Sequence, residues 1–417
     1  MNINTTICIV GGGPSGLLLG LLLAKQGIDV TVIESNGNFE RQFRGEVLQP
    51  RFIQLIRQLN LDTYLEQYEL IKLSSGDVWS GNRKVLSIDY VTDTPEIPYA
   101  IRIKQSVLLQ ALYNLAKKYS SFHFYFNAKA KALIRSSDET TKGVVAVIEQ
   151  REVTITADLI VGADGRFSTI QRLGNFQYKY HTYDFDMIWF TIPAQEMHDF
   201  GIQFKVTPFS NMIAIPSTPT KLQIGFTLKK GEWEKYKENG IVTLRNHLIE
   251  AYPFLKNELM QLTNFRPFVP LQAKTFFVNQ WYKKGCLLIG DAAHCSSPLG
   301  AVGLSLGVET ATVAAGIITE CLRNQDIEFK KLESLTHIRS SDILLVHHMQ
   351  KMLTQLFIKN PPFLKKGVVG IIPIASKTVF SKLAKRKFLL GLKKIPIQPN
   401  QIFTDNEIMK GSFYFTN

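Results

Sequence analysis

The sequence ICIVGGGPSG at residues 7–16 decides the fold class of this chain. Its first four residues are apolar and mostly β-branched, which predicts a buried strand. A helical pattern from Leu17 to Gln26 follows the glycines directly, and Gly27 closes it. Ile28 to Ile33 then predicts a second strand that ends at Glu34. This order of strand, GxGxxG, helix, strand and acid predicts an α/β dinucleotide-binding unit.

Each position of the motif suits a pyrophosphate ligand. Gly11 permits the tight turn, Gly13 lets the backbone approach the phosphates, and Gly16 lets the helix pack closely on the strand. Ser15 lies at the predicted helix N-terminus, where free N–H groups and the positive end of the dipole face the phosphates. Glu34 can accept hydrogen bonds from ribose hydroxyls. The motif alone does not separate FAD from NAD.

Two later strands also end in an acid. Residues 157–168, ADLIVGADGRFS, carry Asp164, and residues 286–294, CLLIGDAAH, carry Asp291. A carboxylate at the position of Asp291 can accept from the ribityl hydroxyls of FAD. In the following stretch, SPLGAVG at residues 297–303, Gly300 and Gly303 leave backbone N–H groups bare before a helical pattern. Such groups can stabilise negative charge on a reduced flavin, so this half of the sequence favours FAD over NAD.

Together the three motifs resemble those of the class A flavoprotein monooxygenases, the para-hydroxybenzoate hydroxylase-like family, over roughly residues 5–345. The resemblance implies FAD as the cofactor and NAD(P)H as a transient co-substrate. It implies hydroxylation of an aromatic or polyketide-like enol through a flavin C4a-hydroperoxide made with O₂. Because the flavin carries the chemistry, no catalytic side chain or general base is identified, and no metal site is expected.

The same resemblance assigns further residues to the cofactor. Arg44 matches an arginine loop beside the flavin, and Gln105 matches a helix start whose glutamine reaches FAD. The alternatives are a solvated loop charge for Arg44 and a helix cap for Gln105. Pro298 belongs to the last motif and is assigned to the cofactor with it.

The sequence also departs from the family pattern. Gln171 stands where the family usually has Arg, Ser305 where it has Asn, and Thr310 where it has Asp. FAD binding is still expected despite these departures, which concern how the flavin is positioned. His294 is better explained by local packing than by catalysis.

The resemblance divides the chain into three parts. We expect a Rossmann-type FAD-binding domain from residues 1–175 and 276–345, a β-rich substrate-binding domain at 176–275, and a helical cap and tail at 346–417. Most aromatic residues of the β-rich part should form its core, with a few lining a pocket. Those in question are Trp189, Phe190, Phe204, Phe226 and Trp233.

Three stretches look closest to one branch of the family, the flavin-dependent tetracycline-inactivating monooxygenases. They are Asp186 to Phe190, Leu222 to Gly231 and Ser297 to Gly303. This branch likeness makes tetracycline inactivation, a form of antibiotic resistance, the leading specific function. Two alternatives stay open: an FAD-dependent dehydrogenase or reductase on the same scaffold, and a membrane-associated FAD protein without catalysis.

Charge is concentrated near the C-terminus. The 417 residues carry a net charge of +13, and residues 351–394 hold eleven Lys or Arg and no acid, which leaves +2 for the rest. A nucleic-acid-binding body would need a basic face of its own, so no nucleic-acid partner is expected. Ile358 to Leu392 is instead expected to cover the substrate site with one apolar helical face. The lysines on its outer face would be Lys382, Lys385, Lys387, Lys393 and Lys394.

Targeting signals are not evident. Ile7 to Ala24 lacks charge, but its glycine cluster would break a membrane-spanning helix, so no integral membrane segment is expected. The residues before it carry no Lys or Arg, unlike a signal peptide. Four cysteines without metal-site spacing fit a reduced protein, and we expect a cytoplasmic monomer.

Overall fold

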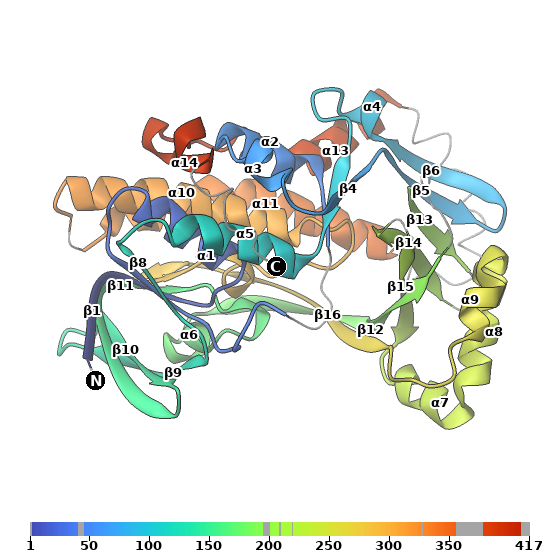
Figure 1. Cartoon of the computed structure of the whole chain (residues 1–417), viewed down its shortest axis with the longest axis horizontal. Coiled ribbons are helices and arrows are strands. Elements are labelled where there is room, and N and C mark those ends of the chain that lie inside the picture. The colour runs from blue at the N-terminus through green and yellow to red at the C-terminus, as the bar shows by residue number, and fades with distance from the viewer. Residues whose placement is uncertain are drawn as a thin grey trace.

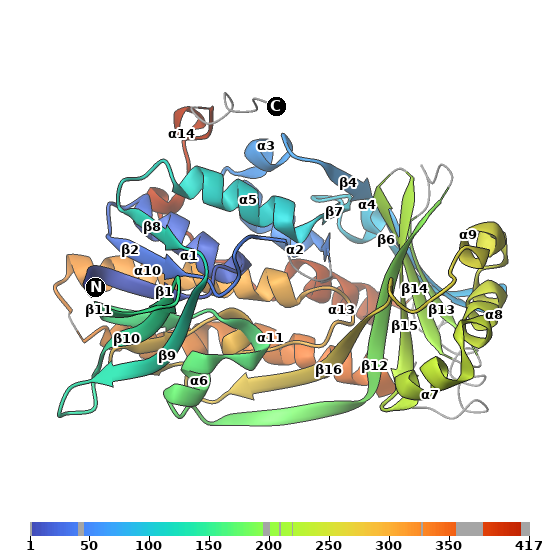
Figure 2. The same ribbon diagram turned by 60° about the horizontal axis from the view of Figure 1, so that its bottom comes forward.

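Two large β-sheets dominate the computed structural model of this chain, with long helices running alongside them (Figures 1 and 2). The structure describes residues 2–40, 46–194, 201–207, 210–218, 220–326, 328–355 and 378–409. All statements below concern these residues.

The eight-stranded sheet is built around five parallel strands. Their order is β18-β11-β1-β2-β8, and each pairs in parallel with its neighbours. The bounds are β1 (Asn2–Val10), β2 (Val30–Ile33), β8 (Phe122–Tyr125), β11 (Arg151–Gly162) and β18 (Cys286–Leu288). The antiparallel strands β9 (Ala128–Arg135), β10 (Thr141–Ile148) and β17 (Tyr282–Lys283) complete it. The carboxyl ends of the parallel strands therefore meet at one edge.

Apolar helices cover this sheet. α1 (Pro14–Ala24) packs against α5 (Gln105–Ala116) and α10 (Gly303–Arg323), and α11 (Glu333–Thr354) lies beside α10. Among the described residues, α10 is long and apolar enough to cross a membrane, but 83% of its most apolar stretch is buried within the protein. This burial is the pattern of a core helix.

The seven-stranded sheet has the order β16-β12-β15-β14-β13-β5-β6. Its later strands are β12 (Tyr178–Pro193), β13 (Ile202–Val206), β14 (Asn211–Thr218), β15 (Lys221–Lys229) and β16 (Val269–Val278). The helices α7 (Glu232–Asn239), α8 (Ile241–Ala251) and α9 (Lys256–Met260) lie on its outer side (Figure 2). A β-rich unit was predicted for residues 176–275, and β12 to β16 span residues 178–278.

The seven-stranded sheet also takes strands from outside residues 176–275. β5 (Ser75–Ser80) pairs in parallel with β13 and antiparallel with β6 (Arg83–Asp89). The sequence division had assigned these two strands to the FAD-binding part. Pairing between strands more than 100 residues apart leaves no local pattern, so it could not be predicted from periodicity.

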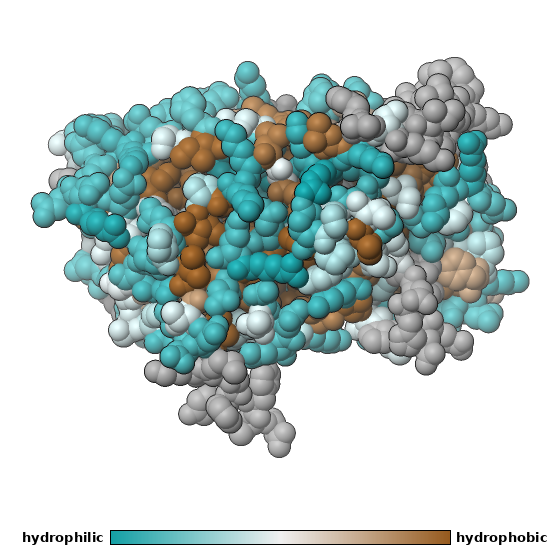
Figure 3. All heavy atoms as spheres, turned by 90° about the horizontal axis from the view of Figure 1, so that it is seen from above, coloured by the Kyte–Doolittle hydropathy of each residue, from teal (hydrophilic) through white to brown (hydrophobic). Residues whose placement is uncertain are grey.

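Short elements connect the two sheets. A small sheet of β3 (Val47–Leu48), β7 (Ala100–Ile103) and β4 (Leu70–Leu73) lies between them, near α2 (Pro50–Gln58), α3 (Asp62–Leu65) and α4 (Tyr90–Asp93). α6 (Thr169–Leu173) follows β11. Seen from above, apolar residues reach the surface in separate patches among hydrophilic ones (Figure 3).

The C-terminal part contains α13 (Val379–Leu390) and α14 (Asp405–Met409). Part of the segment predicted as a helical cap and tail is firmly packed, because Phe403 and Ile408 are buried in the main core. The Phe403 N–H donates to Leu59 O at 3.0 Å, and Gln401 Nε2 donates to Thr312 O at 2.9 Å. These contacts fasten the end of the described chain to α10 and to the residue after α2.

Candidate active site

One cavity of about 850 Å³ collects most of the residues that the sequence singled out. Ten of the twelve predicted cofactor residues line it: Gly11, Gly13, Ser15, Glu34, Gln105, Asp164, Asp291, Pro298, Gly300 and Gly303. They come together because β1, β2, β11 and β18 all end at the same sheet edge. Gly16 does not line the cavity, and Arg44 lies outside the described residues.

The glycine loop is closely packed, as the motif predicts. Gly13 is the N-cap of α1, with Pro14 as the first helical residue. A Cβ on Gly16 would lie 2.0 Å from Gly11 O, so any side chain would push the helix away from the loop. The free N–H groups of this helix terminus face the cavity edge formed by Gly11, Gly13 and Ser15, where an anion is favoured.

Glu34 lies at the end of β2 with only 3% of its surface exposed. Its carboxylate accepts hydrogen bonds from Gly12 N at 2.8 Å and from Asn36 N at 2.9 Å. These bonds fix the acid beside the glycine loop, in the position expected for a ribose contact.

The two other acids differ in what their carboxylates do. Asp164 accepts from Ser168 Oγ and from the backbone N–H groups of Thr169 and Ile170, so both oxygens serve the start of α6. Burial raises the pKa of Asp164. Asp291 is partly exposed to the cavity, and its nearest cation is Arg166, at 3.8 Å from Nη2 to Oδ2. Asp291 therefore has the freer acceptor oxygens of the pair.

Gln105 is the first residue of α5, and the side chain of its N-cap residue, Lys104, makes no capping hydrogen bond. Its Oε1 is buried in the cavity wall and has no hydrogen-bond partner among the described residues. A buried acceptor without a partner is costly, so a ligand with a donor at this point would be stabilised. The helix-cap alternative for Gln105 does not occur.

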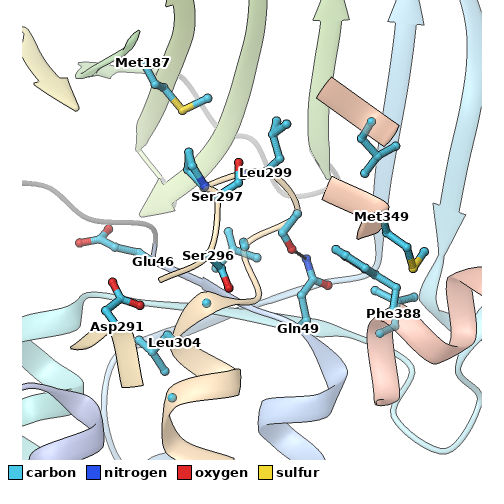
Figure 4. A pocket seen from close by; sticks show the side chains of 18 of the residues that line it. Glu46, Gln49, Met187, Asp291, Ser296, Ser297, Leu299, Leu304, Met349 and Phe388 are labelled. Atoms are coloured by element: carbon cyan, nitrogen blue, oxygen red, sulfur yellow. Dashed lines mark hydrogen bonds between the residues drawn. The ribbon is translucent and has the colours of Figure 1, made fainter. Parts of the chain in front are cut away.

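The stretch from Ser296 to Gly303 crosses the middle of the cavity (Figure 4). It leads into α10, whose first residue is Gly303, so the unpaired N–H groups of a 21-residue helix open toward the site. Asp291 and Leu304 lie at one end of this stretch and Met187 at the other (Figure 4). The arrangement favours an electron-rich ligand atom near Gly300 and Gly303.

Two of the three departures from the family pattern, Gln171 and Thr310, have side-chain hydrogen-bond partners. Gln171 is buried and its Nε2 donates to Ala292 O at 2.8 Å, so it ties α6 to the strand end that carries Asp291. Thr310 Oγ1 lies 3.0 Å from His294 Nε2. Ser305 is fully buried, and its Oγ has no partner among the described residues.

His294 is 1% exposed, stacks near Trp281 and does not line the cavity. Burial lowers its pKa well below the usual value, so it is neutral near pH 7. These contacts agree with the predicted packing role.

The far half of the cavity is apolar. Trp189 on β12 lies over Gly225 on β15, where a Cβ would approach the indole to 2.7 Å. Phe204 also lines the cavity, whereas Phe190, Phe226 and Trp233 pack on the other side of the sheet under α7 and α8. Three of the five aromatic residues thus lie in the core and two line the cavity.

Helices α11 and α13 close this half. Met349 and Met352 come from α11 and Phe388 from α13, and Met349 and Phe388 face the cavity in Figure 4. The expectation that Lys385 lies on an outer face is wrong: its Nζ pairs with Asp93 at 2.8 Å, and both side chains are largely buried. Lys387 lines the cavity as well. The predicted cover before residue 378 lies outside the described residues.

Sequence reasoning missed several residues in the cavity wall. Glu46 pairs with Arg102, and burial raises the pKa of this glutamate although Arg102 lowers it. Gln49 binds the backbone of Gly300 at 3.0 Å. The partners of Glu46 and Gln49 lie 56 and 251 residues away, so no local pattern marks either residue.

The residues present fit an FAD molecule. The glycine loop and the start of α1 suit a pyrophosphate, Glu34 suits a ribose, and Asp291 has acceptor oxygens for hydroxyl groups. The orphaned Gln105 Oε1 and the N-terminus of α10 would meet the remaining part of the cofactor. The apolar half remains for a second molecule.

Comparison with known proteins agrees with this geometry. The sequence model of the family described as FAD binding domain matches residues 4–340. The chain is 27% identical over 359 residues to 6-methylpretetramide 4-monooxygenase of Streptomyces rimosus, covering 86% of this chain and 85% of that protein.

Two solved structures are also similar. The structure of p-nitrophenol 4-monooxygenase from Pseudomonas putida DLL-E4 matches with a TM-score of 0.77 and 18% identity, over 94% of this chain and 100% of that one. Aklavinone-11 hydroxylase in complex with FAD and aklavinone matches with a TM-score of 0.71 and 17% identity, over 82% and 67%. These likenesses confirm the predicted fold class.

Proposed function

The chain belongs to the FAD binding domain family, and we propose that it oxygenates an aromatic or polyketide-like enol, with tetracycline the leading compound. Family membership and the relatives confirm the predicted FAD cofactor and an FAD-dependent monooxygenase. The substrate, the site of oxygenation and the choice between NADH and NADPH belong to the proposal.

The observation that carries the proposal is the continuity of the cavity. One space reaches from the glycine loop past Gly300 to Trp189 and Met187. A substrate held by the apolar half would therefore lie next to a cofactor held by the motif half. A cavity lined mainly by apolar and aromatic side chains suits a flat, multi-ring molecule better than a sugar or a peptide.

The protein's contribution would be binding, orientation and exclusion of water. Bound FAD would supply electron transfer from NAD(P)H and the activation of O₂. The start of α10 would stabilise negative charge near Gly303, and the walls from β12, α11 and α13 would keep water away from the reacting atoms. Glu34, Gln105 and Asp291 would hold the cofactor, and Arg44 would contact it.

Tetracycline is favoured because the first and third branch-like stretches line the cavity, and the second, on β15, pairs with the first. Met187 and Trp189 of the first stretch pair with Thr227 and Gly225 of the second across β12 and β15. The third stretch, 297–303, faces them across the cavity. The relative named 6-methylpretetramide 4-monooxygenase also supports a ring-containing small molecule.

The test is turnover of tetracycline by FAD-loaded protein with NADPH or NADH in air and without oxygen. We expect oxygen-dependent loss of the drug's absorbance and higher tetracycline tolerance in a susceptible bacterium that expresses the protein. If the drug stays unchanged while the protein turns over another phenol, tetracycline is not the substrate and that phenol takes its place. Turnover that continues without oxygen would favour the reductase alternative.

We further propose that the protein acts as a monomer in the cytoplasm without a nucleic-acid partner. Two basic residues near the C-terminus support the absence of a nucleic-acid partner, because Lys385 and Arg386 pair with Asp93 and Glu96 of the same chain. Sedimentation would test whether the protein is a monomer, and a salt-dependent DNA-binding assay would test whether it binds nucleic acid.

A further inference from the structure

Two glutamine side chains from distant segments hold the backbone of residues 297–300. Gln350 on α11 is fully buried. Its Oε1 accepts from Ser297 N at 3.2 Å, and its Nε2 donates to Ser297 O at 2.9 Å and to Leu299 O at 2.7 Å. One amide thus uses an acceptor and both donor hydrogens on a stretch of three residues.

Gln49 holds the next carbonyl, that of Gly300. Its Nε2 donates to Gly300 O at 3.0 Å, and its Oε1 accepts from Tyr90 OH at 2.9 Å (Figure 4). Tyr90 is 1% exposed, and burial raises the pKa of its hydroxyl, so it remains a donor. The tyrosine therefore fixes which end of the Gln49 amide faces Gly300.

The bond from Gln350 to Leu299 O determines where the Gly300 N–H points, and the bond from Gln49 to Gly300 O holds the next peptide unit in place. In a trans peptide the C=O and N–H groups point in opposite directions. Because Leu299 O faces Gln350, the N–H of Gly300 in the same peptide unit points away from that side chain. Among the described residues no hydrogen bond from Gly300 N is found, and Gly300 lines the cavity beside the start of α10.

We propose that Gln350 and Gln49 are positioning residues that orient the Gly300 N–H toward the electron-rich edge of a reduced flavin. They act through the backbone and touch neither substrate nor reacting atoms in this assignment. The inference rests on the proposed placement of the flavin beside Gly300. It concerns the cofactor alone, so it does not depend on which substrate is used.

The test measures the flavin's midpoint potential without substrate in two variants. Gln350→Met keeps the side-chain length and removes all three bonds, and Tyr90→Phe removes only the hydroxyl that orients Gln49. Losing an oriented N–H should weaken binding of reduced FAD about tenfold relative to oxidised FAD. For a two-electron couple, that corresponds to a potential about 30 mV lower.

A matched control separates positioning from general loss of a glutamine. Gln110→Met makes the same change on the exposed face of α5, where the side chain bonds only Asn114 among the contacts found, and its potential should equal that of the wild type. If Gln350→Met does not retain FAD, the flavin midpoint potential of Tyr90→Phe alone tests the inference. A wild-type potential in folded, FAD-loaded Tyr90→Phe and Gln350→Met would overturn the inference. Failure to oxygenate any substrate, with lowered potentials in both variants, would instead count against the proposed function alone.

Discussion

The ring of Phe388 lies directly against Gly300. A Cβ on Gly300 would come within 2.4 Å of Phe388 Cζ, and Phe388 itself is only 7% exposed. The residue at 300 must therefore be glycine while α13 stays in place, and it also has φ of +81°. This contact joins the C-terminal helix to the loop that we assign to the flavin.

Removing the ring should open the cavity between its two halves. We expect Phe388→Ala to keep FAD, to raise the KM for the substrate several-fold, and to divert part of the NAD(P)H consumption to H₂O₂, because water then reaches the site. The ratio of product formed to NAD(P)H consumed measures this. Phe254→Ala, at a residue 53% exposed, is the control and should leave the ratio unchanged.

Internal variants test the C-terminal helix better than truncation does. Deleting everything after residue 360 would remove Phe388, and it would also remove Phe403 and Gln401, which pack on the cofactor-binding part. Full coupling in Phe388→Ala would contradict a role for α13 in closing the site.

Asp291 should hold FAD through its carboxylate oxygens, which face the cavity. Asp291→Ala should weaken FAD by about 1–3 kcal/mol, the range for a hydrogen bond to a charged group. Quenching of FAD fluorescence on titration gives the dissociation constant. Asp158→Ala, at an exposed residue of β11, should bind FAD like the wild type, and equal affinities for all three proteins would remove Asp291 from the cofactor site.

A buried ionic cluster joins α2, α10 and α11. Glu309 accepts from Arg51 Nε and Nη2 at 2.7 Å each and also bonds Arg339, while Asp342 bonds Arg51. Asp342 Oδ1 also accepts from Leu392 N, just after α13.

Neutralising this glutamate should destabilise the fold strongly. Glu309→Gln leaves two buried guanidinium groups facing a neutral amide, and we expect a loss of about 3–5 kcal/mol in the free energy of unfolding by urea. Glu234→Gln breaks the exposed pair with Lys237 and should cost less than about 1 kcal/mol. Similar losses of unfolding free energy in both variants would show that burial of the cluster does not determine its effect on stability.

His347 should make the protein sensitive to acid. Its Nε2 lies 3.0 Å from Ser296 Oγ, and burial lowers the pKa of this histidine from 6.5 to about 4. Between these two pKa values His347 is protonated in the unfolded chain and neutral in the folded chain. The free energy of unfolding therefore falls as pH drops from about 6.5 to about 4.

The free energy of unfolding that is lost in acid through His347 is at most about 3 kcal/mol, and this loss is absent in His347→Gln. Urea unfolding at pH 7, 5.5 and 4.5 should show the wild type losing more stability than His347→Gln. His337→Gln, exposed on the same helix, should follow the wild type. Parallel pH curves for wild type and His347→Gln would refute the assignment.

The sequence predicted those parts of the site that local patterns encode. Glycines and acids directly after apolar strands, such as Gly11 and Asp291, necessarily gather at the carboxyl edge of a parallel sheet. The strand pattern also placed Trp189 on a sheet, but it could not show which face of that sheet lines the cavity. That choice depends on helices α7 and α8 covering the other face.

Other contacts depend on chain-distant pairs that leave no local trace. Gln49 is 251 residues from Gly300, and Gln350 is 51 residues from Leu299. Lys385 looked like a solvated lysine because Asp93, its partner, lies 292 residues away. A helical pattern gives spacing along one element, whereas these bonds depend on how separate elements meet.

The most direct test of the central account is the origin of the oxygen in the product. FAD-loaded protein, NADPH and tetracycline would be incubated under ¹⁸O₂ in ordinary water, and the product analysed by mass spectrometry. The account predicts one ¹⁸O atom per product molecule and no product when O₂ is excluded. A product that carries oxygen only from water, or that forms equally without O₂, would contradict it.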